Sequence, residues 1–149
     1  MPHSIEREIH ISKPIASPAR ELILNIFRTD QHLTARLQEV LRAADLRLDE
    51  YNVMRILRGA GEAGHLRTDV ESRMVHDPER LLALLHKLKS RGLIEGSLRL
   101  NITAAGRELL SRLDGPFEKT IDDAISWIPE EKIRVAIEVL ESIRAGQGA

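Results

Sequence analysis

The feature that most constrains this chain is a long stretch of helical periodicity near its start, from Pro18 to about Leu46. Ser17 and Pro18 supply a side-chain cap and a proline for the first turn. The apolar residues recur at the spacing of one helix face: Ile23, Ile26, Phe27, Leu33, Leu37, Val40, Leu41 and Ala44. A helix of this length spans roughly 40 Å. One small domain cannot cover it, so we expect part of the stripe to contact another chain.

Three shorter helical patterns follow this stretch. We predict helices over 50–58, 68–74 and 78–91. The expected caps are Asp49 for the first, a Thr68–Glu71 capping box for the second, and Asp77 before Pro78 for the third. The third helix has a leucine stripe that we expect to be buried, formed by Leu81, Leu84, Leu85 and Leu88.

The period then changes between Leu93 and Ile102. Leu98, Leu100 and Ile102 alternate with polar residues, which is typical of a half-buried strand. A two-residue turn at Gly96-Ser97 predicts one tight β-hairpin. Two further helices are expected after it. The first is capped by Thr103 and runs towards Trp127 with a bend at Gly115-Pro116, and the second starts at Pro129. The predicted fold class is therefore mainly α with a small β-hairpin, in a winged helix-turn-helix arrangement.

Composition narrows the class of protein. The chain has 149 residues, the size of one domain, and no cysteine, which excludes disulfides, thiolate catalysis and Cys-ligated zinc. It has no signal-peptide pattern and no apolar run long enough to span a membrane, so we expect a soluble, cytoplasmic protein. Residues 67–107 contain eight Lys and Arg and five acidic residues, whereas residues 114–141 contain eight acidic residues and three basic ones. Only the middle of the chain suits an anionic partner.

Catalytic and metal sites are not expected. The six histidines are scattered without the spacing of a helix-borne zinc site, so we predict neither a metal nor a cofactor. The serines lack a nucleophile-elbow context, and no Gly-rich phosphate loop follows a strand. Acidic pairs such as Asp122-Asp123 are typical of a solvated helix face. We therefore do not expect an enzyme.

Four stretches, taken in order, carry a resemblance to a known family. They are Leu48 to Gly64 (LDEYNVMRILRGAGEAG), Arg73-Met74, Lys89 to Ile94 (KSRGLI) and Asn101 to Leu110 (NITAAGRELL). Together they resemble the MarR family of bacterial transcription regulators, over roughly residues 18–145. The resemblance implies a homodimer joined through the first and the last two helices, a recognition helix at Asp77–Arg91 and a wing at Leu93–Ile102. It also implies relief of repression by a small aromatic or phenolic effector.

The resemblance divides the chain into four parts. We expect a flexible N-terminal arm (1–17), a dimerisation helix (18–48), a winged helix-turn-helix lobe (49–103) and C-terminal dimerisation helices (104–145).

The chain departs from the family pattern at the surface that would contact DNA. Leu82-Ala83 stands where members usually have Thr-Arg, and His86-Lys87 stands where they usually have Asp-Arg. The wing is short, because Gly96-Ser97 replaces a long tip that usually carries an Asp-x-Arg group. Glu71 occupies a position that is usually Ala. Arg is the commonest major-groove contact, so we predict weaker or narrower DNA binding than in relatives.

Candidate site residues follow from this placement. We expect the outer face of the recognition helix to carry Arg80, Ala83, Lys87 and Ser90. Contacts to the DNA backbone are expected from His86, Lys89 and Arg91. The predicted DNA-binding set is Arg67, Thr68, Arg80, Ala83, His86, Lys87, Ser90 and Arg99. The family likeness also suggests a ligand cleft lined by Phe27, His32, Tyr51, Met54 and Arg55, although each of these suits an ordinary core or surface position equally well.

Two functions remain open at this point. The first is a dimeric transcription regulator that binds double-stranded DNA through paired recognition helices and responds to a small aromatic effector. The second is a dimeric protein-interaction module that has lost direct base contacts. Leu82-Ala83 favours the second, because an exposed Leu82 would extend an apolar patch that suits a protein partner.

Overall fold

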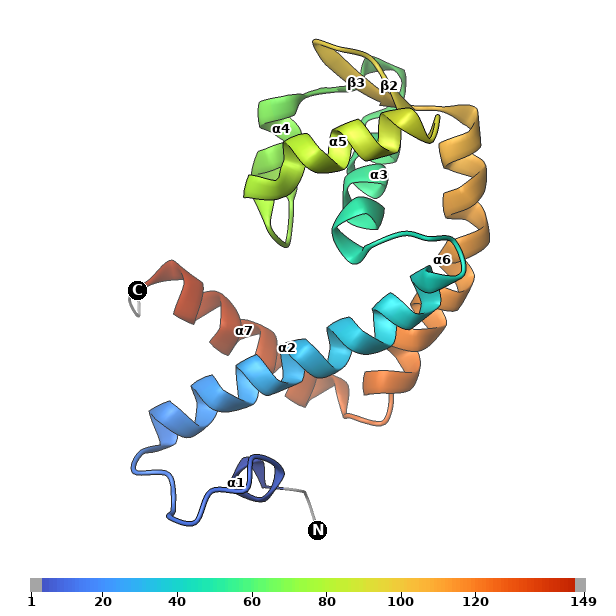
Figure 1. The fold of residues 1–149 in the computed structure, drawn as a ribbon. Coiled ribbons are helices and arrows are strands. Elements are labelled where there is room, and N and C mark those ends of the chain that lie inside the picture. Colours follow the sequence, from blue (N-terminus) through green and yellow to red (C-terminus); the bar gives the residue numbers. More distant parts are fainter. Residues whose placement is uncertain (1–3, 147–149) are drawn as a thin grey trace.

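The computed structural model describes residues 4–146 and shows a small lobe joined to a helical stalk (Figure 1). The lobe consists of α3, α4, α5 and the β-strands, and the stalk consists of α2, α7 and the far half of α6. The elements in chain order are α1 (Ile5–Glu8), α2 (Pro18–Arg42), α3 (Leu48–Ala60), η1 (Gly61–Ala63), β1 (His65–Leu66), α4 (Arg67–Arg73), η2 (Pro78–Arg80), α5 (Leu81–Ser90), β2 (Ile94–Glu95), β3 (Arg99–Ile102), α6 (Ala104–Ile125) and α7 (Glu130–Ala145).

The predicted hairpin is present, as β2 and β3, but three residues (96–98) separate the strands, where a two-residue turn was predicted at Gly96-Ser97. These strands pair antiparallel, with Ile94 opposite Ile102. Gly96 makes the turn possible, because its φ is 101° and an added Cβ would lie 1.9 Å from the carbonyl oxygen of Arg99. The described chain also forms a strand that was not predicted, β1, which pairs with β3 and gives the sheet order β1-β3-β2. Two residues are too few to show a strand period in the sequence.

Three helix starts differ from the predicted caps. α3 begins before Asp49, whose Oδ1 accepts a hydrogen bond from the backbone N–H of Glu50 (2.9 Å) within the first turn. The start of α4 is capped by Asp69, whose Oδ2 accepts a hydrogen bond from the backbone N–H of Leu66 (3.3 Å), and not by Thr68 and Glu71. After Pro78 the chain makes a 3₁₀ turn, and α5 begins only at Leu81. Glu50 and Asp69 accept the backbone hydrogen bonds at the starts of α3 and α4 in place of the predicted residues, whereas α5 has no side-chain cap.

The other two predicted caps are confirmed. The Ser17 hydroxyl accepts from the N–H of Arg20 (3.2 Å) at the start of α2. The Thr103 hydroxyl accepts from the N–H of Gly106 (3.1 Å) and donates to the carbonyl of Gly92 (2.7 Å). Thr103 therefore joins the end of α5 to the start of α6.

The segment before α2 is partly folded against that helix. The α1 turn buries Ile5, and Glu6 Oε1 accepts from the backbone N–H of Ile15 (2.8 Å). Glu8 lies 3.6 Å from the guanidinium of Arg28 on α2. The part of the expected arm that the structure describes thus includes an ordered turn.

The hydrophobic core lies in the lobe and in the lobe-side half of α6. The predicted leucine stripe of α5 is buried there, beside Leu57 and Met54 of α3 and Leu100 of the sheet. α6 continues as one helix through Pro116 and carries the core towards the stalk (Figure 1). Gln38 fixes the turn between α2 and α3, because its amide donates to the carbonyl of Leu46 (2.7 Å) and accepts from the N–H of Leu48 (3.0 Å).

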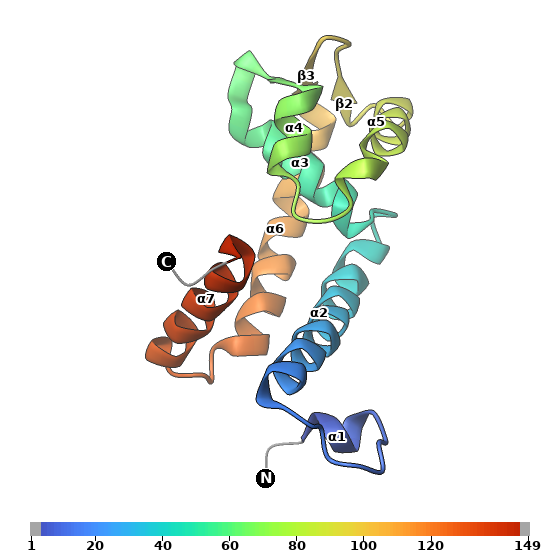
Figure 2. The same ribbon diagram turned by 90° about the vertical axis from the view of Figure 1, so that its left-hand side faces the viewer.

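The stalk is much less covered than the lobe. Leu41 is the one α2 residue that is buried, and none of the α7 residues, all of which the structure describes, is buried. Figure 2 shows α2, α6 and α7 as three rods below the lobe. None of the helices within residues 4–146 is both long and apolar enough to cross a membrane.

Candidate nucleic-acid interface

The outer face of α5 is the part of the lobe best placed to contact a partner. The leucine stripe fixes the helix orientation by facing the core, which leaves five residues on the opposite side. These exposed residues are Leu82, Ala83, His86, Lys89 and Ser90. The leucine of this set is 64% exposed. We call this set the α5 outer face.

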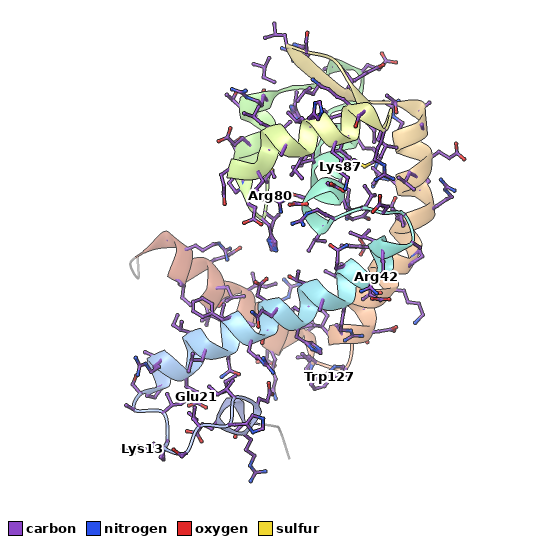
Figure 3. The ribbon with its side chains drawn as sticks, viewed as in Figure 1. Lys13, Glu21, Arg42, Arg80, Lys87 and Trp127 are labelled. Atoms are coloured by element: carbon purple, nitrogen blue, oxygen red, sulfur yellow. The ribbon has the colours of Figure 1, made fainter. Side chains whose placement is uncertain are left out.

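Arg80 and Lys87 are not on that face, contrary to the prediction. Both are half-buried and lie on the flank of α5 that faces the start of α3, as Figure 3 shows. Arg80 donates to Oδ2 of Asp49 (3.3 Å). Lys87 Nζ lies 3.1 Å from Oε1 of Glu50, an ion pair without the angles of a hydrogen bond. These two cations are therefore paired with carboxylates of α3, while their own side chains are 40% and 42% exposed.

The reason for this placement is the burial of the two carboxylates. The side chain of Asp49 is 4% exposed and that of Glu50 is 0% exposed. A buried carboxylate is tolerated only when it is paired with a charge and accepts hydrogen bonds. Glu50 also accepts from the backbone N–H of Arg47 (2.9 Å) through Oε2. The buried acids of α3 thus bind the flank cations of α5.

A third cation near α5 is also used internally. The Arg91 guanidinium donates to the carbonyls of Ala44 (2.8 Å) and Asp45 (2.6 Å), which follow the end of α2. Cations are stabilised near the carbonyl end of a helix. Arg91 therefore joins the lobe to the stalk.

A groove beside the α5 outer face is lined by two of the exposed cations of the lobe, Arg67 and Lys89. It has a volume of about 260 Å³ and is lined by Arg67, Leu82, Leu85, His86, Lys89, Ser97 and Leu100. Among residues 4–146, no carboxylate lines it. Its lining thus combines apolar and cationic side chains.

The remaining predicted DNA-binding residues lie close to this groove in sequence but do not line it. Thr68 borders a separate hollow with Glu71, Ser72 and Pro78. Arg99, on β3, is exposed and donates a long hydrogen bond to the carbonyl of Ala63 (3.4 Å). The Ser90 hydroxyl donates to the carbonyl of Lys87 (2.8 Å) within its own helix. Leu98, predicted to be half-buried, is 78% exposed beside the hairpin turn.

A second candidate site lies between the lobe and the stalk. This cleft has a volume of about 370 Å³ and is formed by α2, α3, the segment after α4, and α6. Its lining includes the predicted residues Tyr51 and Arg55, together with residues that sequence analysis missed: Asp30, Leu33, Thr34, Leu37, Leu48, Asp49, Asn52, Val75, His76 and Phe117.

The other predicted ligand residues do not line this cleft. Phe27 is exposed on the stalk. His32 borders a polar hollow between α1 and α2, with Glu8 and Arg28. Met54 is fully buried in the core. The family likeness does not indicate which side of each helix faces the cleft, because that depends on tertiary packing.

The aromatic floor of the cleft is held in a polar network. The rings of Tyr51 and Phe117 are 4.4 Å apart, and the Tyr51 hydroxyl donates to Oδ1 of Asp114 (3.0 Å). Burial, together with this contact to Asp114, raises the pKa of Tyr51 to about 12. Arg58 donates to both oxygens of Asp114 (2.6 and 3.2 Å), and this pairing lowers the pKa of that carboxyl.

The rim of the cleft brings distant segments together. Asn52 accepts from the backbone N–H of Val75 (3.1 Å), and His76 Nε2 lies 3.8 Å from Oδ1 of Asp30 on α2. Asp49 lines the cleft and also binds Arg80 at the start of the recognition segment. One buried carboxylate therefore touches both candidate sites.

Apolar side chains are exposed along the stalk. They lie on α2, at the α6–α7 turn and along α7: Leu22, Ile23, Phe27, Trp127, Val135, Ile137, Val139, Leu140 and Ile143. Figure 3 shows Trp127 at the end of the stalk far from the lobe. The apolar residues of α7 cover an arc of about 200° around the helix, wider than one neighbour needs. The described part of the chain contains no cluster of three or more His, Cys, Asp or Glu that would suit a metal ion.

Comparison with known proteins places this geometry in a fold. No protein-family model and no curated protein sequence matches the chain. Solved structures do match, among them a MarR-family transcriptional regulator from Rhodococcus sp. RHA1, with a TM-score of 0.75 and 20% identity over 87% of this chain and 97% of that one. The chain has the MarR-like winged-helix fold.

Two further matches have the same fold. One is Bordetella bronchiseptica BpsR, whose DNA binding is regulated by 6-hydroxynicotinic acid (TM-score 0.76, 16% identity, 88% of this chain and 98% of that one). The other is S. aureus MepR in complex with DNA (TM-score 0.70, 16% identity, 82% and 94%). These neighbours are transcriptional regulators rather than enzymes. The predicted fold class and MarR-like resemblance are therefore confirmed at the level of fold.

Proposed function

We propose that this protein is a homodimeric, DNA-binding transcriptional regulator with atypical DNA contacts and a ligand-responsive cleft. The observation that carries the proposal is the cationic groove beside the exposed face of α5, in a winged lobe. A recognition helix in this position enters the major groove, and lysine and arginine at its sides bind phosphates. The DNA complex of the neighbour MepR supports this use of the fold.

The dimer is supported by the uncovered stalk. The exposed apolar residues of the α7 arc and of α2 form a surface whose contact with water is unfavourable. A second copy packed through α2, α6 and α7 would bury them. In such a dimer the two α5 helices contact successive major grooves about one helical turn apart.

The DNA contacts are proposed to be weaker or narrower than is usual for a winged helix. Arg80 and Lys87 are bound to Asp49 and Glu50, and Arg91 is bound to backbone carbonyls. Three cations near the recognition helix are thus unavailable to phosphate unless those contacts break. The hairpin is also short, with three residues between its strands.

The cleft between the lobe and the stalk is the proposed effector site. Tyr51 and Phe117 offer an aromatic floor whose two rings are tilted by 32°, and Arg55 at the rim suits an anionic group on a small aromatic molecule. The regulation of BpsR by 6-hydroxynicotinic acid supports this class of ligand. Because Asp49 lines the cleft and binds Arg80, a ligand that displaces Asp49 would alter the start of α5.

The decisive experiment is selection of bound sequences from random duplex DNA at low and at moderate salt, followed by anisotropy titration. We expect an enriched inverted repeat with half-sites about 10 base pairs apart. The double variant Arg67→Ala/Lys89→Ala should bind that duplex more weakly, with a flatter salt dependence. The matched control is Arg42→Ala, which removes an exposed cation outside the groove and should leave affinity unchanged.

A second candidate function, a protein-interaction module on the same scaffold, is favoured by one observation. Leu82 and Leu98 are large apolar residues exposed on the lobe. The same selection separates the two functions, because absence of enrichment at either salt would contradict DNA binding and favour the module. Nanomolar binding to a specific duplex at physiological salt would contradict the weakened contacts instead.

A further inference from the structure

The α5 outer face has an unusual chemistry for a DNA contact. With Arg80 and Lys87 bound to the acids of α3, no guanidinium remains on the α5 face described above. Its first turn presents Leu82 and Ala83, and its second presents His86, Lys89 and Ser90. The first turn is the important one, because the N-terminal residues of a recognition helix contact the base edges.

An aliphatic side chain has one match on the floor of the major groove. Base edges there present hydrogen-bond donors and acceptors, and the C5 methyl group of thymine is the apolar exception. Packing Leu82 against a donor or acceptor would leave that polar group without a partner, which is unfavourable. Packing it against a thymine methyl buries apolar surface on both sides.

The surroundings of Leu82 favour DNA over other occupants. Arg67, His86 and Lys89 line the same groove as Leu82, and its lining residues within 4–146 include no acid. This combination of apolar and cationic side chains complements a methyl group on a base edge that lies near the phosphate backbone.

We propose that Leu82, with Ala83 beside it, contacts the C5 methyl group of a thymine in each half-site, so that Leu82 is a specificity-determining residue. This inference rests on the proposed function, since it requires a bound duplex. It adds the chemical class of the contacted base, which the position of the helix alone does not supply.

The contact has a measurable size. Burying one methyl or methylene group contributes about 0.8 kcal/mol, which corresponds to a change of about fourfold in affinity. A symmetric dimer makes the contact twice, so loss of both methyl groups should weaken binding by about fifteenfold.

The experiment is a uracil scan of the selected duplex. Each thymine is replaced in turn by deoxyuridine, which pairs identically but lacks the C5 methyl group, and affinity is measured by anisotropy. We expect one thymine per half-site to show the fourfold loss with the unaltered protein. With Leu82→Ala, thymine and uracil at that position should bind alike. Leu98→Ala, which shortens an exposed leucine beside the hairpin turn, should retain the full sensitivity to uracil.

The outcomes separate this inference from the proposed function. A specific duplex whose affinity is unchanged by every uracil substitution would overturn the thymine contact and leave DNA binding in place. Sensitivity to uracil that persists in Leu82→Ala would also overturn the role of Leu82. If no duplex is enriched, both proposals fail, and the groove is left to a protein partner.

Discussion

Lys87 and Lys89 are two residues apart on α5, yet the structure assigns them opposite roles. Lys87 neutralises the buried carboxylate of Glu50, whereas Lys89 lines the exposed groove. Replacing each in turn by methionine keeps an unbranched apolar side chain, one atom shorter, and removes the ammonium group. We expect Lys87→Met to lower stability and Lys89→Met to lower the salt dependence of DNA binding.

The magnitude for Lys87→Met follows from the burial of its partner. Removing one member of a fully buried ion pair costs about 3–5 kcal/mol. The Lys87 side chain is 42% exposed, so water reaches its end of the pair. We therefore expect about half that cost, about 2 kcal/mol. For a chain of this size, that loss lowers Tm by about 6 °C. Lys89→Met should change stability by less than about 0.5 kcal/mol.

The assays are urea unfolding for stability and anisotropy titration over a range of salt for DNA binding. The salt slope is the slope of the logarithm of the binding constant against the logarithm of the salt concentration. For a dimer that carries each substitution twice, Lys89→Met should reduce the size of this slope by about 2, and Lys87→Met should leave it unchanged. The double variant Glu50→Gln/Lys87→Met should recover stability relative to Lys87→Met, because no unpaired charge stays buried. A stable Lys87→Met, or a Lys87→Met with a reduced salt slope, would refute the assignment.

Three other predictions concern the cleft, the stalk and the hairpin. Tyr51 is the one tyrosine of the chain, so the absorbance of tyrosinate should titrate near pH 12. Because the pKa of Tyr51 is raised in the folded protein, its contribution to stability is present below pH 10 and is lost as the pH rises towards 12. A titration midpoint near pH 10 would contradict the buried hydrogen bond to Asp114. Leu140→Glu places a charge on the exposed apolar arc of α7 and should yield a monomer by light scattering, with Glu138→Gln on the same helix as a dimeric control; a dimer in both would contradict the proposed interface. Gly96→Ala should destabilise the lobe by about 2 kcal/mol in urea unfolding, because φ is positive at Gly96 and the added Cβ would clash with the Arg99 carbonyl. The control is Gly115→Ala, which should not destabilise the lobe because its added Cβ has open space.

Much of the fold could be predicted because periodicity is a local signal. The stripe from Leu81 to Leu88 fixed which side of α5 is buried, and the alternation before Ile102 located the hairpin. The side opposite those leucines centres on His86, so the outer face was available from the sequence. Helical spacing puts Arg80 and Lys87 on one face with Ala83 and Ser90, but that face is offset from the side opposite the leucines.

The rest depends on residues distant in the chain. The partners of Arg80 and Lys87 are acids on α3, more than thirty residues away, and nothing local in the sequence marks Asp49 and Glu50 as buried. The same holds for the cleft, where His76 meets Asp30 across a long stretch of chain. Helical spacing indicates which residues share a face, but it does not indicate which neighbour that face meets.

The exposed state of α7 has a consequence for how this protein acquires its final form. A helix of sixteen residues without tertiary support is only marginally stable in water. In the proposed dimer, the second copy and not its own chain covers its apolar arc. The ordering of the last helix and the encounter of two chains would then be one step, so that protein concentration governs both how many chains are paired and how many are fully folded.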